Sequence, residues 1–234
     1  MSKLKYFSKS DIIIWSTSVM LIVVSFAVFD RESYTTLIAS LLGVTSLIFC
    51  AKGNPIGQVL MIIFSLFYGV ISYAFAYYGE MITYLGMTMP MAVFALVSWL
   101  RNPFNGNRAE VKVNSIPKTE HVFMWGLTLV VTVGFYYILS YFGTANILPS
   151  TLSVTTSFAA VYLTFRRSPY FALAYAANDI ILIVLWSLAS ITDIRNISVV
   201  VCFVAFLVND IYGFLNWQKM KTRQKNYENE NNRS

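Results

Sequence analysis

The hydrophobic pattern divides the chain into eight apolar segments that are separated mostly by short polar connections. Alternation of apolar and polar residues with a period of two is missing, so the pattern favours helices over a membrane barrel. Each segment has about 20 residues, which is enough to cross a bilayer as a helix. The sequence therefore predicts an all-α membrane protein with eight transmembrane helices, over residues 12–29, 33–51, 56–78, 81–100, 122–142, 146–165, 169–191 and 196–217.

Composition agrees with this prediction and excludes a large soluble domain. Of the 234 residues, 57% are hydrophobic and only 12% are charged, whereas a soluble domain carries about 25% charged residues. The net charge of +6 comes from basic residues at segment ends, which does not indicate a nucleic-acid partner. The sequence has no phosphate-binding glycine loop, dinucleotide-binding motif or metal-binding cysteine motif. We therefore expect no enzymatic activity, no catalytic residue, no cofactor and no metal.

The basic residues predict how the spans are oriented. Eight spans place both termini on one side, together with the loops after the second, fourth and sixth spans. That side holds 15 of the 17 Lys and Arg residues, and the other side holds Arg31 and Arg195. Because Lys and Arg are enriched in cytoplasmic loops, we expect a multi-pass protein of the cytoplasmic membrane with both termini in the cytoplasm. The same rule set predicts that the tryptophans at segment ends lie at the membrane interface: Trp99, Trp125 and Trp217.

An internal repeat relates the two halves of the chain. The sequence Lys-Gly-Asn-Pro at residues 52–55 resembles Arg-Arg-Ser-Pro at residues 166–169, at an offset of 114, and Trp99 matches Trp217 at an offset of 118. A single linking helix gives both three-helix units the same orientation, and parallel-repeat transporters bind substrate between their units near the midplane. The predicted organisation is a tail with an extra helix (1–32), a first repeat (33–101), a loop with a linker helix (102–143), a second repeat (144–218) and a polar tail (219–234).

Two Asn-Asp pairs interrupt the apolar segments, Asn178-Asp179 and Asn209-Asp210. A carboxylate at mid-bilayer costs roughly 2.5–3.5 kcal/mol on insertion scales, so such residues usually face a bundle interior or a cavity. Aromatic residues on the face of Asp179 suit a flat, and especially a cationic, heterocycle. We predict a substrate site formed by the third, fourth, seventh and eighth segments, from Gln58, Tyr84, Phe171, Tyr175, Asn178, Asp179, Trp186, Asn209, Tyr212 and Asn216. The alternative is that some of these groups only join helices, and Asp210 could pair with a neighbouring helix.

Three motifs resemble those of one transporter family. They are Arg-Arg-Ser-Pro-Tyr at 166–170 leading into Asn178-Asp179, Tyr-Tyr-Gly-Glu at 77–80, and Tyr-Gly-Phe-Leu-Asn-Trp at 212–217 with its basic tail. On these residues the sequence resembles the PnuC family of bacterial vitamin and nucleoside transporters, relatives of the SWEET sugar transporters. The resemblance covers the second to eighth segments. It implies a SWEET-like parallel repeat of three, one and three helices behind one extra N-terminal helix.

The resemblance further implies facilitated diffusion of a nucleoside-like molecule, above all nicotinamide riboside, with phosphorylation by a cytoplasmic kinase that traps it. A homotrimer has precedent among relatives of this fold. One departure affects the substrate: family members that carry nicotinamide riboside resemble one another in a Trp-x-x-Trp motif, whereas residues 170–175 here hold no tryptophan. A deoxynucleoside such as thymidine, or thiamine, is therefore an alternative substrate. Proton-coupled transport through Asp179 or Asp210 and a non-transport role as a membrane enzyme or receptor subunit are further alternatives.

Overall fold

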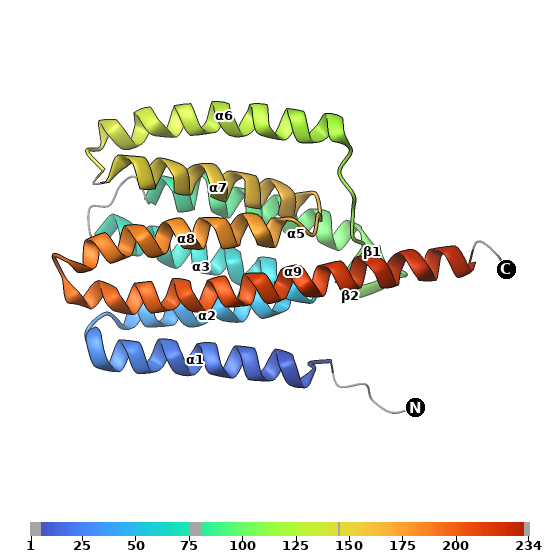
Figure 1. The fold of residues 1–234 in the computed structure, drawn as a ribbon, viewed down its shortest axis with the longest axis horizontal. Coiled ribbons are helices and arrows are strands. Elements are labelled where there is room, and N and C mark those ends of the chain that lie inside the picture. Colours follow the sequence, from blue (N-terminus) through green and yellow to red (C-terminus); the bar gives the residue numbers. More distant parts are fainter. Residues whose placement is uncertain (1–5, 75–80, 145, 232–234) are drawn as a thin grey trace.

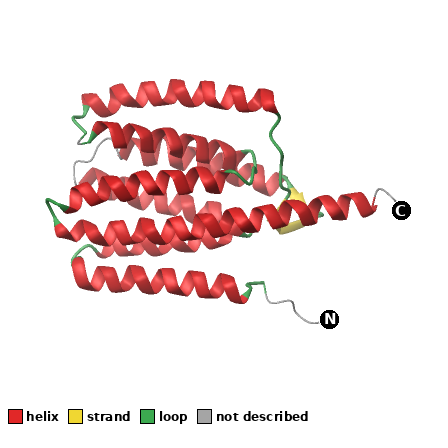
Figure 2. Ribbon diagram, in the orientation of Figure 1, coloured by secondary structure: helices red, strands yellow, loops and turns green. Residues whose placement is uncertain are grey.

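The computed structural model describes residues 6–74, 81–144 and 146–231 and consists mainly of helices that run side by side (Figures 1 and 2). A π-helical stretch, η1 (Thr83–Thr88), leads directly into α5, and a 3₁₀ turn, η2 (Ile194–Asn196), precedes α9. A short antiparallel hairpin of β1 (Pro103–Phe104) and β2 (Asn107–Val111) follows α5. The helices are α1 (Lys9–Phe29), α2 (Tyr34–Ala51), α3 (Ile56–Ala74), α5 (Met89–Arg101), α6 (Lys118–Tyr141), α7 (Ile147–Phe165), α8 (Phe171–Ser190) and α9 (Ile197–Asn231).

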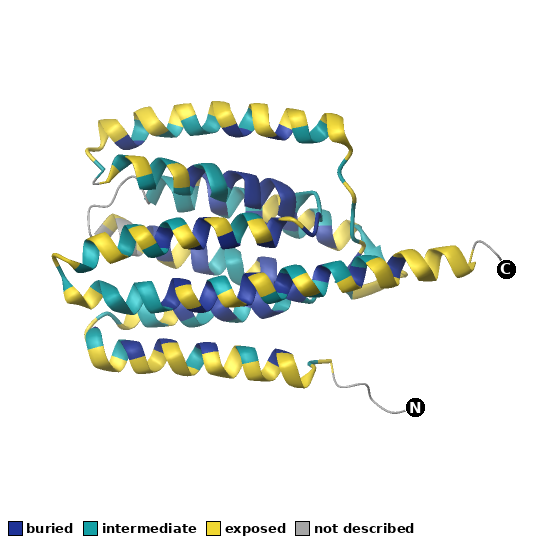
Figure 3. Ribbon diagram, viewed as in Figure 1, coloured by how far each residue is buried: buried dark blue, intermediate teal, exposed yellow. Residues whose placement is uncertain are grey.

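The described helices follow the predicted segments in order. Seven are long and apolar enough to span a membrane when η1 and α5 are taken together, and α3 adds the shorter apolar stretch 56–70. Helices α1 and α6 lie at opposite edges of the bundle and are mostly exposed (Figure 3), with large apolar side chains on the outside, such as Val122 and Val130 on α6. A continuous apolar surface of this kind fits contact with lipid. The prediction of an all-helical, multi-pass membrane protein is confirmed, while the motif at 77–80 lies outside the described residues.

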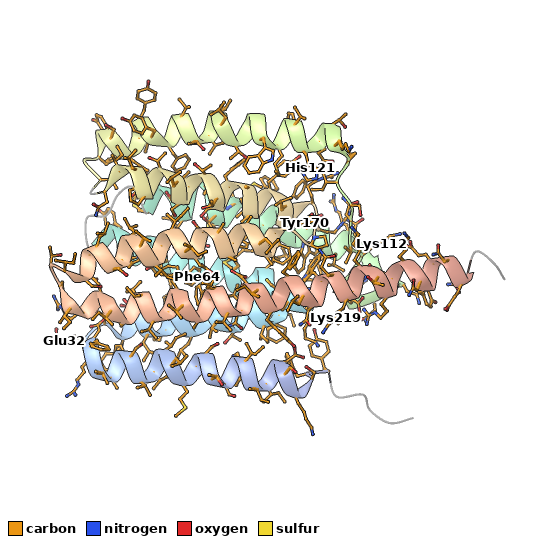
Figure 4. The ribbon with its side chains drawn as sticks, viewed as in Figure 1. Glu32, Phe64, Lys112, His121, Tyr170 and Lys219 are labelled. Carbon is orange, nitrogen blue, oxygen red and sulfur yellow. The ribbon has the colours of Figure 1, made fainter. Side chains whose placement is uncertain are left out.

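One end of the bundle carries the start of α1, the hairpin and the end of α9 (Figure 1). We call it the terminal side. Helix α9 has 35 residues, or about 52 Å at 1.5 Å per residue, which exceeds the roughly 30 Å hydrocarbon core. Its last part therefore projects beyond the bundle, near Lys219 and Lys112 in Figure 4. The residues predicted as a polar tail continue this helix to Asn231.

The hairpin was not predicted, although its turn has a recognisable signal. Asn105 and Gly106 have positive φ angles of 49° and 76°, and Asn-Gly is the preferred pair for a two-residue hairpin turn. The buried side chain of Gln224 holds β2 against α9. Its Oε1 accepts a hydrogen bond from Val113 N (2.8 Å), and its Nε2 donates to Val111 O (3.0 Å).

The connections α2–α3 and α7–α8 share one backbone geometry at the predicted offset of 114. Each contains a residue with a left-handed backbone, Gly53 at φ 65° and Arg167 at φ 58°. The N–H of each donates to the carbonyl three residues earlier, Cys50 O (2.9 Å) and Thr164 O (3.0 Å). The extended segment that begins with β2 then contacts both turns, because Val111 N donates to Gly53 O (2.9 Å) and Asn114 N donates to Arg167 O (3.0 Å).

The predicted interfacial location of Trp99 and Trp217 is wrong. Both side chains are almost completely buried, at 1% and 0% exposure, and their rings contact each other with centroids 5.4 Å apart. Trp99 Nε1 donates to Thr164 O (2.9 Å), and Trp217 Nε1 donates to Cys50 O (2.8 Å). Each tryptophan therefore bonds the opposite half of the chain at equivalent positions. Trp125 is exposed, as expected for a residue at the outer surface.

The helices of the two halves also meet in an equivalent way. Helix α2 packs against α9, and α7 packs against α5. If α2, α3 and α5 correspond to α7, α8 and α9, these two interfaces are the same interface formed twice. The space between them holds the site described next.

Candidate functional site

A cavity of about 100 Å³ lies between the two sets of helices. Its wall comes from α2, α3, η1, α7, α8 and α9, with the end of α6 and the residue Thr144 that follows it. Figure 4 labels Phe64, which lines the cavity from α3. The polar residues of the wall are Thr83, Thr88, Thr144, Ser150, Ser153, Ser157, Asn178, Asp179 and Asp210. The aromatic residues are Phe64, Tyr68, Tyr84, Tyr175, Trp186, Phe203 and Phe206.

The π-helical stretch η1 forms part of this wall. Pro90 stands at the start of α5 and has no N–H to donate to the preceding turn. The widened turn is closed instead by Met89 N, which donates to Tyr84 O five residues earlier. Such π-turns recur at functional sites because they displace side chains from the regular helical register. Here the stretch contributes Thr83, Tyr84 and Thr88 to the cavity.

Asn178 is held in one orientation by two hydroxyl groups from α7. Its Oδ1 accepts hydrogen bonds from Ser153 Oγ and from Thr156 Oγ1, both at 3.0 Å. With the carbonyl oxygen occupied twice, the remaining hydrogen-bonding capacity of this side chain is the donor pair on Nδ2. Asn178 is 6% exposed and lines the cavity, so it can offer donors to a bound ligand.

Asp179 on α8 and Asp210 on α9 meet in the wall of the cavity. They are 3% and 4% exposed, and their carboxyl groups lie within hydrogen-bonding reach of each other. Like charges this close and this deeply buried strongly oppose double ionisation. Asp210 thus pairs with a residue of a neighbouring helix, which is the alternative that the sequence left open for it. It also lines the cavity.

Aromatic rings cover the α3 side of the cavity. The rings of Tyr68 and Tyr84 have centroids 4.7 Å apart, and Phe64 contacts Tyr84 at 5.9 Å and Phe206 at 6.3 Å. Tyr175 and Trp186 add rings from α8. Aromatic rings beside carboxyl groups favour a flat heterocycle, and cations gain further stabilisation from the ring faces.

The structure brings together five of the ten predicted site residues: Tyr84, Tyr175, Asn178, Asp179 and Trp186 all line this cavity. The other five make contacts elsewhere. Phe171 packs against Trp217, with ring centroids 4.9 Å apart, and Gln58 Nε2 donates to Cys50 Sγ at 3.3 Å. Asn209 and Tyr212 bond α1, and Asn216 on α9 does not line the cavity.

Helix α1 is attached through a polar cluster on the terminal side. The buried carboxylate of Asp11 accepts hydrogen bonds from Tyr212 Oη (2.5 Å) and from Lys52 Nζ (3.0 Å). Deeper in the bundle, Asn209 Nδ2 donates to Ser18 Oγ (2.8 Å). The hydrophobic pattern places Asp11 just before the first span, but Ser8 and Asp11 have the spacing of a helix capping box, which the structure contains.

Sequence reasoning missed the hydroxyl side of the cavity. Ser150, Ser153 and Ser157 line it from α7. Their spacing of three and then four residues is the helical repeat that places side chains on one face. That spacing indicates one polar face on this helix. It does not by itself indicate a cavity, because serines are also common at ordinary contacts between transmembrane helices.

An aromatic layer fills the bundle between the cavity and the terminal side. Its buried rings are Trp99, Phe171 and Trp217, and Tyr175 packs against them while also lining the cavity. The two indole hydrogen bonds described above tie the layer to both halves of the chain. On this side the cavity therefore ends at packed side chains.

These features define a multi-pass helical membrane protein with a buried polar and aromatic cavity between its halves. A sequence model of the family described as "Nicotinamide mononucleotide transporter" matches residues 33–219, and the chain belongs to this family. It is 26% identical over 201 residues to a nicotinamide riboside transporter PnuC of Neisseria mucosa, covering 84% of this chain and 76% of that one. It is 25% identical over 196 residues to the protein of the same name from Haemophilus influenzae, covering 82% of each.

A solved structure shares the fold. The crystal structure described as the vitamin B3 transporter PnuC superimposes with a TM-score of 0.79 at 23% sequence identity, covering 93% of this chain and 94% of that one. The family model and the two PnuC relatives confirm the predicted resemblance to the PnuC family, and this structure confirms the fold.

Proposed function

We propose that this protein takes up nicotinamide riboside across the cytoplasmic membrane by facilitated diffusion. The observation that carries the proposal is the cavity between the halves of the chain, which combines the Asn178 amide, the Asp179–Asp210 carboxyl pair and several aromatic rings. Its chemistry suits a pyridinium ring joined to a hydroxyl-rich sugar. The names of two relatives support the same substrate.

The charges of the cavity favour the riboside over the mononucleotide in the family's description. None of the described residues that line it is Lys, Arg or His. A phosphate group is usually bound by such side chains or by a helix N-terminus, and it would be repelled by the carboxyl pair. A riboside has no phosphate, so we expect the mononucleotide to be a poor substrate.

The proposal includes a mechanism. The two halves act as a SWEET-like parallel repeat, supported by the equivalent turns at Gly53 and Arg167 and by the reciprocal bonds of Trp99 and Trp217. The excess of Lys and Arg that the sequence predicts for the side of the termini, 15 of 17, supports a cytoplasmic location of both termini. The aromatic layer is then the cytoplasmic barrier, which must open for release. A cytoplasmic kinase then phosphorylates the imported riboside and so traps it in the cell. The protein assembles as a homotrimer, and light scattering in detergent tests this oligomeric state.

Uptake by proteoliposomes tests the substrate. Vesicles containing the purified protein are offered radiolabelled nicotinamide riboside, the mononucleotide, thymidine or thiamine. We expect saturable uptake of the riboside that a protonophore does not abolish. Uptake of thymidine or thiamine alone would favour the alternative substrates, and loss of concentrative uptake on collapse of a proton gradient would favour proton coupling. Uptake of none of the four would overturn the proposal.

Matched variants test the site. Asn178→Ala removes donors from the cavity and is expected to raise KM for uptake about 2- to 10-fold, the value of one hydrogen bond of about 0.5–1.5 kcal/mol. Asn209→Ala is the control, because this asparagine of the second Asn-Asp pair bonds Ser18 on α1. It is expected to lower thermal stability and leave KM unchanged. Equal effects of the two variants on KM would show that Asn178 has no special contact with the substrate.

A further inference from the structure

The carboxyl groups of Asp179 and Asp210 are neighbours in the buried wall of the cavity. These groups lie within hydrogen-bonding reach of each other, and an ionised carboxylate can only accept hydrogen bonds. A hydrogen bond between two carboxyl groups therefore requires a proton on one of them. With a single shared proton the pair carries one negative charge.

Within the described part of the chain, no Lys, Arg or His lines the cavity to replace this proton. The titratable groups facing the pair are the partly buried Tyr175 on α8 and the buried thiols of Cys202 on α9 and Cys50 on α2. Tyr68 and Tyr84 line the cavity from α3 and η1. Helix α7 contributes hydroxyl groups and no charged side chain to the cavity wall. On α1, the carboxylate of Asp11 is already neutralised by Lys52. Two neighbouring buried charges without a counter-ion are strongly unfavourable.

One oxygen of the pair is left for a ligand. Apart from the shared proton, no N–H or O–H group of the described residues bonds Asp179 Oδ2, which is fully buried. Both aspartates line the cavity together with Tyr175, Trp186 and the rings on the α3 side. A cation among these rings would lie close to the carboxyl groups and stabilise a second negative charge on them.

Resting on the function proposed above, we propose that a cationic heterocycle and the shared proton compete for the Asp179–Asp210 pair. Before binding, the pair has one proton and one negative charge. When the cation binds, one O–H bond breaks and the proton passes to the buffer, leaving two carboxylates beside one positive charge. The net charge of the site stays the same. A neutral nucleoside gains nothing from the second carboxylate, so it binds with the proton in place.

Isothermal titration calorimetry of the purified full-length protein tests this competition. Nicotinamide riboside is titrated at one pH in phosphate and in Tris, which take up protons with different enthalpies, and Kd is then measured from about pH 6 to pH 8. We expect the observed binding enthalpies in the two buffers to differ by nearly the difference between the protonation enthalpies of the buffers. A difference of that size corresponds to the release of about one proton. We also expect Kd to rise by up to tenfold for each unit that the pH falls while the free pair retains its proton, because release of one proton gives that slope.

A neutral ligand and three variants serve as controls. The dihydropyridine form of the riboside has the same shape and no ring charge, and it is expected to bind without buffer or pH dependence. Asp179→Asn and Asp210→Asn each remove the shared proton and should abolish proton release on binding. Asp193→Asn changes an exposed aspartate between α8 and α9 that is paired with Arg195. This control variant should still release a proton on binding.

The outcomes separate this inference from the proposed function. Binding of nicotinamide riboside with the same enthalpy in both buffers and a constant Kd would overturn the competition and leave the substrate proposal standing. Proton release that persists in both Asp179→Asn and Asp210→Asn would assign it to another group and also overturn it. A protein that binds neither nicotinamide riboside nor the cation thiamine at any pH would overturn both.

Discussion

The reciprocal tryptophan bonds allow a quantitative prediction about stability. In Trp217→Phe the ring still fills part of the layer, but the hydrogen bond from Nε1 to Cys50 O is lost. Cys50 O keeps its hydrogen bond from Gly53 N, so the loss is near the net value of one bond, about 0.5–1.5 kcal/mol. The smaller ring leaves a cavity that costs about 1 kcal/mol more. The total is about 1.5–2.5 kcal/mol.

This loss is large enough to measure. For a chain of 150–250 residues, 1 kcal/mol shifts Tm by about 2–4 °C, so the variant should unfold about 3–10 °C lower. Trp99→Phe should give a similar shift, because Thr164 O likewise keeps its bond from Arg167 N. Circular dichroism at 222 nm in detergent follows the transition. The control is Trp125→Phe, whose side chain is 57% exposed and whose Tm should not change.

Two results would contradict this reasoning. A Tm of Trp217→Phe within one degree of the parent protein would show that the bond and the packing of the indole contribute little. An equal loss of Tm in Trp125→Phe would show that the effect comes from tryptophan replacement in general. Strongly unequal losses in Trp99→Phe and Trp217→Phe would mean that the two halves are not equivalent at this layer.

Three further changes test other contacts of the fold. Gln224→Ala removes the buried side chain that joins α9 to β2 and should lower Tm by several degrees, because Val113 N and Val111 O lose these partners. The control Lys225→Ala, at an exposed position, should leave Tm unchanged. Equal Tm values for the two variants would show that the Gln224 contact contributes little. Lys52→Met removes the cation beside buried Asp11 and should lower Tm more than Lys112→Met, whose partner Glu228 is exposed; the reverse order would argue against the cluster. Arg167→Gly replaces the residue at φ 58° and should raise Tm by a few degrees, because a left-handed backbone costs about 1–2 kcal/mol for residues other than glycine. A fall in Tm would mean that contacts of the Arg167 side chain outweigh this backbone strain.

The sequence by itself determined the class of the protein and the centre of its cavity. Transfer of apolar segments into lipid depends on local composition, so the hydrophobic pattern alone predicts the spans. The high cost of a carboxylate in the membrane is enough to single out Asn178 and Asp179 as residues that face the interior of the bundle. The offset of 114 between the two turns also came from local residues, and it is the offset at which Gly53 and Arg167 adopt the same backbone.

Only the tertiary structure decided which way each helix faces. Asn209 and Asp210 are neighbours in sequence and point about 100° apart around α9; the first bonds Ser18 on α1, and the second meets Asp179. Trp99 and Trp217 resemble interfacial residues in the sequence, but carbonyl groups of the opposite half lie within reach of their indole nitrogens. The rotation of a helix about its axis is fixed by its neighbours, and a pattern of polar residues on two faces does not reveal which neighbour each face meets.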